Sequence, residues 1–393
     1  MRYYKENVVI ESHDFNWKNW LLVISFILAP MTGLRVAKVG PAEFLCILWI
    51  VINLNKKTTY VDRAFLKFWL FFLFFIFLGS IWGQFFYPNE SSITGVFSWI
   101  YFAFISIFSC SILNCMDFFQ IDLILKKISI GSTIWYFLMY LYSQFVSNTF
   151  LGAPLWYGGK RFSGGGTNPH QVALLLGIVI IFLLHFMFEE EIIYRKLVMI
   201  ICAACAFFLL ILTESSTGLM AVFCGAIILL FEKIVCIFKN DMHIKFIFCL
   251  IILSFLIIGN QIVYSALMEW ISSDGNGLGR LEIFSSFDVA FWKNPIFGLG
   301  PGAHGLNGTM ELHNTYLEII AMSGCCGFLV FLLFTIKLVA TIRNNIMSLA
   351  VLLCMYIFGL AGFGARRLVY WMVISLLYIY SVKLENSKSR NWC

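Results

Sequence analysis

Charged side chains are scarce in this sequence. They account for 12% of its 393 residues, whereas 61% of the residues are apolar. A soluble domain usually carries roughly 25% charged residues, and its core cannot bury this much apolar surface. The composition therefore excludes a soluble globular enzyme, a disordered chain and a nucleic-acid-binding protein, and we expect no nucleic acid among its partners.

The apolar residues also lack the alternation with polar residues that marks a transmembrane β-barrel. They form continuous runs instead, and a helix crosses the hydrocarbon core of a bilayer in about 20 residues. We therefore predict an all-α, polytopic integral membrane protein, with about twelve transmembrane helices in a single transmembrane domain over residues 1–393. The predicted spans are 17–34, 40–54, 66–86, 93–115, 128–151, 168–188, 197–213, 216–237, 244–264, 313–336, 346–363 and 367–384.

Features of processed or metal-binding proteins are missing as well. We expect no cleavable signal peptide, since Glu6, Glu11 and Asp14 precede the first apolar run. Nine of the 12 cysteines lie in or at the ends of apolar runs, where Cys packs as a small hydrophobic residue. Cys202 and Cys205 share a helix face, but no second pair or His cluster completes a zinc site. We predict no metal and no cofactor.

The positive charges are distributed unequally between the two sides of the predicted bundle. With both termini cytoplasmic, 19 Lys and Arg residues lie inside and 8 outside, in agreement with the positive-inside rule. Lys predominates inside and Arg outside, and Arg is preferred where a planar group must bind phosphate or carboxylate. The outer arginines therefore suggest an anionic substrate, although snorkelling or loop pairing is the alternative for any single one. The outer cations are Arg35, Lys38, Lys160, Arg161, Arg280, Lys293, Arg366 and Arg367.

The first informative outer loop spans residues 152–168 and is rich in glycine. Glycine lets the backbone approach a ligand closely, and Lys160 and Arg161 lie beside this run. Asn168 is a good N-cap and Pro169 suits a first helical turn, so we predict a helix that starts here and an anion site next to it. The alternative is a flexible loop whose two cations reach the membrane surface.

The longest outer loop spans residues 265–312. Residues 280–292 predict an amphipathic helix at the membrane interface, and the Gly-rich turn 294–302 follows it. Loops of this length in a compact protein are usually functional. The loop leads directly to His313, and His170 lies on the same outer side. A His near arginines can act as a general base near neutral pH; each can instead serve as a hydrogen-bonding or capping residue.

Several segments resemble motifs of the O-antigen polymerase and O-antigen ligase superfamily. Their order and spacing on a helical scaffold of this size make the resemblance specific, although each motif alone is loose. The resemblance covers residues 155–330 in detail and the hydropathy profile throughout. The matching segments are Arg161 with the Gly-rich run and Asn168-Pro169; Arg280 with the later segment 294–300; His313-Asn314, followed after nine residues by Gly324-Cys325-Cys326-Gly327; and the polar patch 213–218, which lacks the Arg often found there.

This resemblance implies an integral-membrane glycosyltransferase of the lipid-carrier type, with a GT-C-like helical architecture and a long periplasmic loop. Its donor would be an oligosaccharide on undecaprenyl pyrophosphate, used without a metal at the periplasmic face of the bacterial inner membrane. A polymerase transfers the growing glycan to the next lipid-linked repeat unit, and a ligase transfers it to lipid A–core. The short central loop and the Arg–Asn–Pro pattern favour the polymerase. Membrane lipid and a chain-length regulator protein are further candidate partners.

We predict that arginines hold the pyrophosphate of the donor and that His313 removes the proton from the acceptor hydroxyl. Guanidinium groups that meet the departing negative charge stabilise the transition state more than the ground state. The predicted catalytic residues are His313, Arg280 and Arg161, and the predicted substrate-binding residues are Arg35, Lys160, Asn168, His170, Asn314, Arg366 and Arg367. Alternatives for the base are Asp274, Glu282, Asp288, Glu311 and Glu318.

A transporter or flippase is the alternative from another class, because about twelve spans would suit it. Transporters place ionisable residues and broken helices near the middle of the membrane, often within an internal repeat. The predicted spans are almost free of charge, and the two halves show no clear repeat. Glu43 and Glu214 are the carboxylates closest to an intramembrane position. These features favour the glycosyltransferase.

Overall fold

The computed structural model describes residues 15–36, 39–54, 61–86, 90–237, 287–288, 290–302, 312–362 and 364–390. Helices account for most of these residues. In chain order they are α1 (Asn19–Leu28), η1 (Thr32–Leu34), α2 (Pro41–Asn53), α3 (Arg63–Phe86), α4 (Glu90–Asn114), α5 (Phe118–Phe145), α6 (Pro169–Glu189), α7 (Ile193–Leu212), α8 (Ser216–Ile237), α11 (Thr315–Ile342), α12 (Ile346–Leu360), η3 (Gly364–Arg366) and α13 (Leu368–Arg390).

The helices lie where the apolar runs predict them. Eleven of the twelve predicted runs each overlap a helix among the described residues, and the run 244–264 lies outside those residues. In the part of the chain that the structure describes, seven helices are long and apolar enough to cross a membrane, namely α3, α4, α6, α7, α8, α11 and α13, while α1, α2 and α12 are apolar but shorter. The structure therefore confirms an all-α, polytopic membrane protein.

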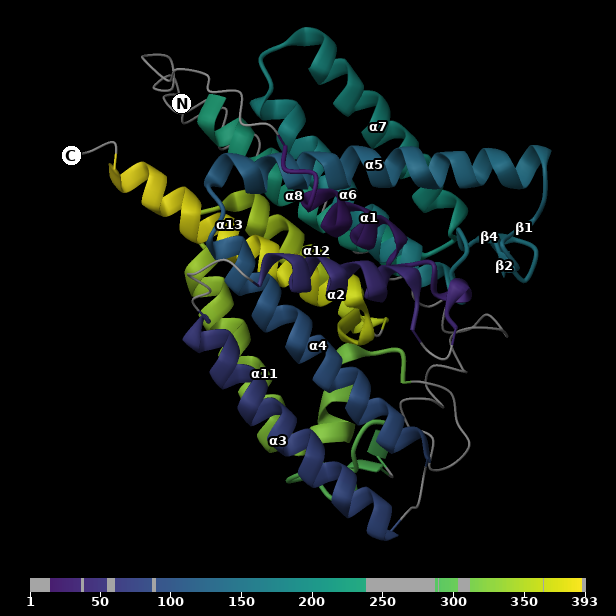
Figure 1. Ribbon diagram of the computed structural model, residues 1–393, viewed down its shortest axis with the longest axis vertical. Coiled ribbons are helices and arrows are strands. Elements are labelled where there is room, and N and C mark those ends of the chain that lie inside the picture. Colours follow the sequence, from purple (N-terminus) through teal and green to yellow (C-terminus); the bar gives the residue numbers. More distant parts are fainter. Residues whose placement is uncertain are drawn as a thin grey trace, which may run out of the picture.

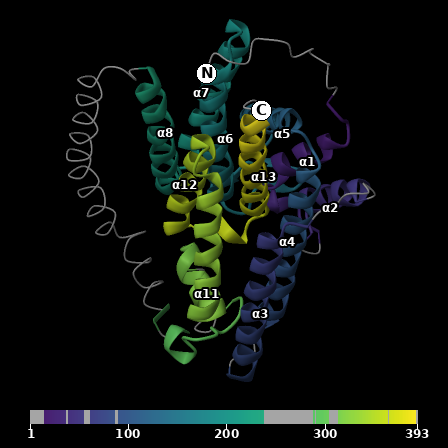
Figure 2. The same cartoon turned by 90° about the vertical axis from the view of Figure 1, so that its left-hand side faces the viewer.

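The helices α6 and α13 lie in the middle of the bundle (Figures 1 and 2). In each of them 78% of the apolar window is buried, as expected for a helix that is apolar on all sides. α6 contacts α5, α7, α8 and α12, and α13 contacts α4 and α11. Aromatic rings join α3 to α11 and α13: Phe68 stacks on Phe334 with centroids 4.1 Å apart, and Trp69 lies 4.5 Å from Trp371. The packing of α6 and α13 in the core therefore fixes the positions of the chain segments just before these helices.

The helix α11 is broken at Gly324, whose backbone has φ 66° and ψ −173°. The turn 294–300 fills this break and replaces hydrogen bonds that a continuous helix would make. Backbone groups at a break inside a membrane need partners, because unpaired N–H and C=O groups are costly there. The four hydrogen bonds run from Leu299 N to Ala321 O (2.9 Å), Gly300 N to Met322 O (3.0 Å), Cys325 N to Pro295 O (2.8 Å) and Cys326 N to Ile296 O (3.2 Å).

Glycine allows the turn 294–300 to approach its neighbours this closely. A Cβ atom on Gly324 would lie 2.1 Å from Ile296 O. On α3, Cβ atoms on Gly79 and Gly83 would lie 2.6 Å and 2.0 Å from carbonyl oxygens of the turn. Small residues four apart are a usual means of close packing in membranes. Two segments of the family motifs, the turn 294–300 and the glycines of α11, are therefore one packed unit.

The two outer loops have more local structure than a flexible coil. Between α5 and α6, the strands β1 (Thr149–Phe150) and β2 (Ala153–Pro154) form one antiparallel hairpin, and β3 (Trp156–Tyr157) and β4 (Arg161–Phe162) form another. In the long loop, residues 287, 288 and 290–293 are helical, in agreement with the end of the amphipathic helix predicted over 280–292. The start of that predicted helix lies outside the described residues.

Candidate functional site

The N-terminus of α11 is tied to the segment between α12 and α13. Thr315 Oγ1 donates to Gly362 O (2.8 Å) and accepts from Gly364 N (3.0 Å). Asn314 Oδ1 caps α11 by accepting from two N–H groups of its first turn, and Asn314 Nδ2 donates to Leu360 O at 2.8 Å. The His-Asn motif therefore lies beside the segment that carries Arg366 and Arg367.

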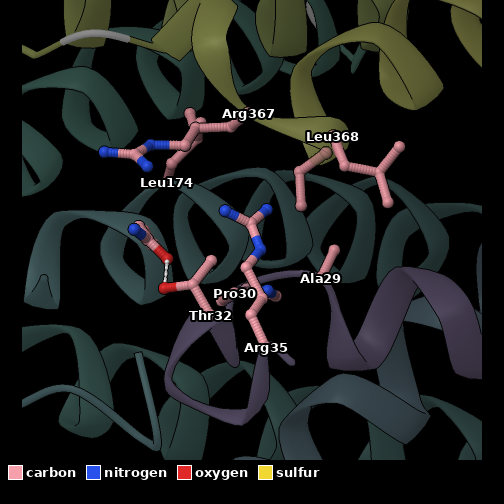
Figure 3. A pocket seen from close by; sticks show the side chains of 9 residues that line it. Ala29, Pro30, Thr32, Arg35, Leu174, Arg367 and Leu368 are labelled. Carbon is pink, nitrogen blue, oxygen red and sulfur yellow. Dashed lines mark hydrogen bonds between the residues drawn. The ribbon is translucent and has the colours of Figure 1, made fainter. Parts of the chain in front are cut away.

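That segment forms one wall of a pocket (Figure 3). Arg35, which follows η1, and Arg367, which precedes α13, extend into the pocket from opposite sides. Thr32 and Gln171 add polar groups, and the cavity between these side chains is small, about 10 Å³, which is room for about one water molecule. The structure thus brings together two predicted substrate-binding arginines from opposite ends of the chain. The apolar lining consists of Ala29, Pro30, Leu174, Leu368 and Val369.

Gln171, which lines this pocket, connects three segments that are far apart in the sequence. It lies in the first turn of α6 and is 4% exposed. In the amide orientation that satisfies its neighbours, its nitrogen donates to Thr32 Oγ1 (2.7 Å) and Pro30 O (2.9 Å), and its oxygen accepts from Arg367 Nη1 (2.9 Å). Thr32 Oγ1 also lies 3.0 Å from Thr167 Oγ1 of the 152–168 loop. A buried amide with both ends bonded in this way fixes Arg367 relative to α6.

Arg35 forms an ion pair with Glu43 of α2. The second carboxylate oxygen of Glu43 accepts from Gly40 N at 3.1 Å, in the first turn of that helix. The side chain of Glu43 is 10% exposed and that of Arg35 is 35% exposed. The Arg35 guanidinium group therefore lines the pocket while it is paired with a buried carboxylate, and this pairing restricts its position.

Arg161 lies at the end of α7, with its guanidinium group on two backbone carbonyls. Arg161 Nε donates to Thr213 O (3.0 Å) and Nη2 donates to Glu214 O (3.3 Å), just after the last turn of α7. A cation at this position offsets the negative end of the helix dipole. Lys160 is exposed in the turn between β3 and β4. The structure gives Arg161 a local role in holding the end of α7, and its contact with pyrophosphate stays a prediction.

The start of α6 is built as the sequence predicts. Asn168 Oδ1 caps the helix by accepting from His170 N at 2.9 Å, and Pro169 is its first residue. His170 Nδ1 lies 3.0 Å from Ser215 Oγ. The polar patch 213–218 is thereby joined both to α6 and to the hairpin that carries Arg161, which unites two of the family-like motifs.

His313 has a left-handed backbone conformation, with φ 49°, immediately before α11. Such a conformation is uncommon for a residue other than glycine, and strain of this kind is concentrated at functional sites. Glu318, which is 2% exposed, folds back so that its Oε1 accepts from Leu312 N at 2.9 Å. Glu318 therefore lies next to the backbone that leads into His313, although it comes five positions later in the sequence.

The remaining predicted residues are distributed as follows. Arg366 is exposed in η3, next to the pocket-lining Arg367. Asp288 accepts a hydrogen bond from Trp292 Nε1 at 2.8 Å within the long loop. Arg280, Asp274, Glu282 and Glu311 lie outside the described residues.

Sequence reasoning missed Thr32 and Gln171, and it noted Glu43 only as an intramembrane carboxylate. Thr32 and Gln171 lie near the ends of apolar runs, where a single polar residue is common and points to no partner. Their importance comes from hydrogen bonds across more than 130 residues of sequence, such as Thr32 Oγ1 to Gln171. Only the folded chain shows which distant groups they meet.

Comparison with known proteins agrees with the motifs. Residues 200–332 match the family model described as O-antigen ligase. This match confirms the resemblance to the O-antigen polymerase and ligase superfamily, whose members are membrane glycosyltransferases that act on polyprenyl-linked sugars. No curated protein and no solved structure matches the chain. The fold and the match together indicate a multi-pass membrane transferase of lipopolysaccharide synthesis, and the pocket residues Arg35, Gln171 and Arg367 lie outside the matched region.

Proposed function

We propose that the chain is an O-antigen polymerase, a membrane glycosyltransferase that joins oligosaccharide repeat units carried on undecaprenyl pyrophosphate. The pocket of Arg35 and Arg367 is the observation that carries this proposal. A lipid-linked pyrophosphate needs fixed cations for its phosphates, and Arg35 and Arg367 supply two of them at this pocket. We therefore assign the pyrophosphate to this pocket; Arg280, which lies outside the described residues, stays a predicted ligand.

The reaction is a displacement at the anomeric carbon of the donor sugar. The acceptor hydroxyl attacks that carbon, and the bond to the pyrophosphate oxygen breaks with its electron pair. Arg35 and Arg367 stabilise the negative charge that develops on the leaving pyrophosphate. The imidazole of His313 takes the hydroxyl proton. A single displacement of this kind inverts the configuration at the anomeric carbon.

The site is proposed to face the periplasm of the bacterial inner membrane, with both chain termini in the cytoplasm. The excess of Lys and Arg in the opposite connections supports this orientation. Alkaline phosphatase, which is active only outside the cytoplasm, should be active when fused after Lys160 and inactive when fused after Arg195. The reverse pattern would place the pocket on the cytoplasmic side and rule out this substrate route.

The nearest alternative is an O-antigen ligase, which differs only in its acceptor. The lipopolysaccharide of a strain that lacks this chain separates the two. We expect lipid A–core that carries a single repeat unit, because ligation would continue while polymerisation stops. Bare core together with accumulated lipid-linked polymer would instead identify a ligase.

A transporter is the alternative from another class, and the break in α11 is the feature that favours it. In transporters the backbone groups at such a break bind ions or substrate. Here the backbone groups on both sides of the break are hydrogen-bonded to the turn 294–300. A transporter would therefore need its ion site elsewhere. Glu214, one of the two candidate carboxylates, has φ 50° in the turn after α7, and its carbonyl accepts from Arg161. Proton-linked uptake that is lost in Glu214→Gln would contradict the glycosyltransferase.

A further inference from the structure

The two guanidinium groups of the pocket are held by side chains of different charge. Arg367 is held by the neutral amide of Gln171, whereas Arg35 is held by the carboxylate of Glu43. The carboxylate offsets one of the two positive charges that face the pocket. An anion that binds to Arg35 must therefore compete with a negative group that the protein itself provides.

The structure also indicates which member of this ion pair can change partner. Glu43 is fixed at the N-terminus of α2, where its Oε2 accepts from Gly40 N at 3.1 Å and the helix dipole favours a negative charge. Gly40 makes room for it, since a Cβ atom there would lie 2.5 Å from that oxygen. Glu43 is 10% exposed, whereas Arg35 is 35% exposed and lies outside any helix. The arginine is the group that can turn.

We propose that the Glu43 carboxylate competes with the substrate diphosphate for Arg35. The inference rests on the proposed function, because it concerns the same pocket. When the diphosphate enters, Arg35 exchanges the carboxylate for phosphate oxygens; when the carrier diphosphate leaves, the Arg35–Glu43 pair forms again. No covalent bond changes in this exchange.

The chemistry of the product explains why such a competitor would be useful. The donor diphosphate is esterified at both ends, whereas the product diphosphate keeps only the lipid ester and so carries more negative charge. Two arginines without a counter-ion would bind the product more tightly than the donor and slow each turnover. Glu43 weakens the binding of the product diphosphate, because its pairing with Arg35 stabilises the pocket without a bound anion.

Two isosteric substitutions test the idea by changing the charge beside the arginines in opposite directions. Glu43→Gln removes a negative charge next to Arg35, and Gln171→Glu adds one next to Arg367. We expect Glu43→Gln to bind geranyl diphosphate about tenfold more tightly and Gln171→Glu about tenfold more weakly, measured with purified protein in detergent at fixed ionic strength. Partial unfolding would weaken binding in both variants, so opposite shifts have an electrostatic cause.

Matched controls make the same charge changes away from the pocket. Glu190→Gln, after the end of α6, and Gln144→Glu, on an exposed position near the end of α5, should leave binding of geranyl diphosphate unchanged. Geraniol, which has the chain without the diphosphate, should bind equally to all of these variants. In turnover, Glu43→Gln should lower KM and kcat together, because the product leaves more slowly.

The outcomes separate this inference from the proposed function. Weaker binding in Glu43→Gln would mean that Glu43 only holds Arg35 in place, and the competitor role would be overturned. If Arg367→Ala leaves binding of geranyl diphosphate and of inorganic pyrophosphate intact, the pocket does not take a diphosphate, and both proposals fail. If Arg367→Ala abolishes binding while Glu43→Gln and Gln171→Glu bind like the parent, only the competitor role fails.

Discussion

Replacing His313 by asparagine is expected to slow glycan transfer by about 10²–10⁴-fold, the usual effect of removing a general base. Asparagine is the informative choice because it tolerates positive φ, and His313 has φ 49°. It can still form hydrogen bonds, but its amide cannot take up a proton. The measurement is the initial rate at which the purified protein extends a defined lipid-linked repeat unit.

The same variant distinguishes chemistry from positioning. Its thermal unfolding in detergent and its binding of geranyl diphosphate should match the parent, since neither depends on a base. Transfer at the parent rate would show that another group removes the proton. Glu318→Gln would then be the next variant, because the Glu318 carboxylate is buried beside the backbone that leads into His313.

Replacing Gly324 by alanine is expected to destabilise the folded protein by about 3 kcal/mol or more. The new Cβ atom would lie 2.1 Å from Ile296 O, and the contact is with backbone, which cannot move without breaking the hydrogen bonds between the turn 294–300 and α11. The φ of 66° adds strain to the clash. The measurement is the temperature of unfolding in detergent, together with the yield of monodisperse protein.

Gly152→Ala is the matched control for this substitution. Gly152 has φ 82° but nothing within 4 Å of a Cβ atom, so alanine there has the backbone strain without the clash. Its expected cost is about 1–2 kcal/mol. Equal destabilisation by the two variants would show that backbone strain alone is responsible and that the packing of the turn 294–300 into α11 contributes little.

The helices could be predicted because the hydropathy of a segment reflects whether lipid or water surrounds it. A run of apolar residues must become a helix in lipid, since only a helix pairs its own backbone groups there. The run 168–188 became α6 (Pro169–Glu189) within two residues, and the Asn168 cap and Pro169 confirm the local signal. Charge suggested arginines as substrate-binding residues, which stays a prediction, and it named eight outer cations without saying which ones meet.

The local sequence could not reveal the break in α11. Residues 313–336 read as one continuous apolar span, and Gly324 is an ordinary residue in a membrane helix. The break exists because the turn 294–300 replaces the lost hydrogen bonds, and that partner comes from another part of the chain. Arg161 illustrates the same limit: its charge suggested a ligand, but the carbonyls after α7 are where the fold places its guanidinium group.

The sequence by itself determined that this chain is a helical membrane protein and that it resembles the O-antigen polymerase and ligase superfamily, because composition, periodicity and short motifs are local properties. The tertiary structure decided that Arg35 and Arg367 share a pocket, which the buried amide of Gln171 and the carboxylate of Glu43 organise. Those contacts join the start of the chain to its end. They depend on how the central helices α6 and α13 pack, which no local pattern encodes.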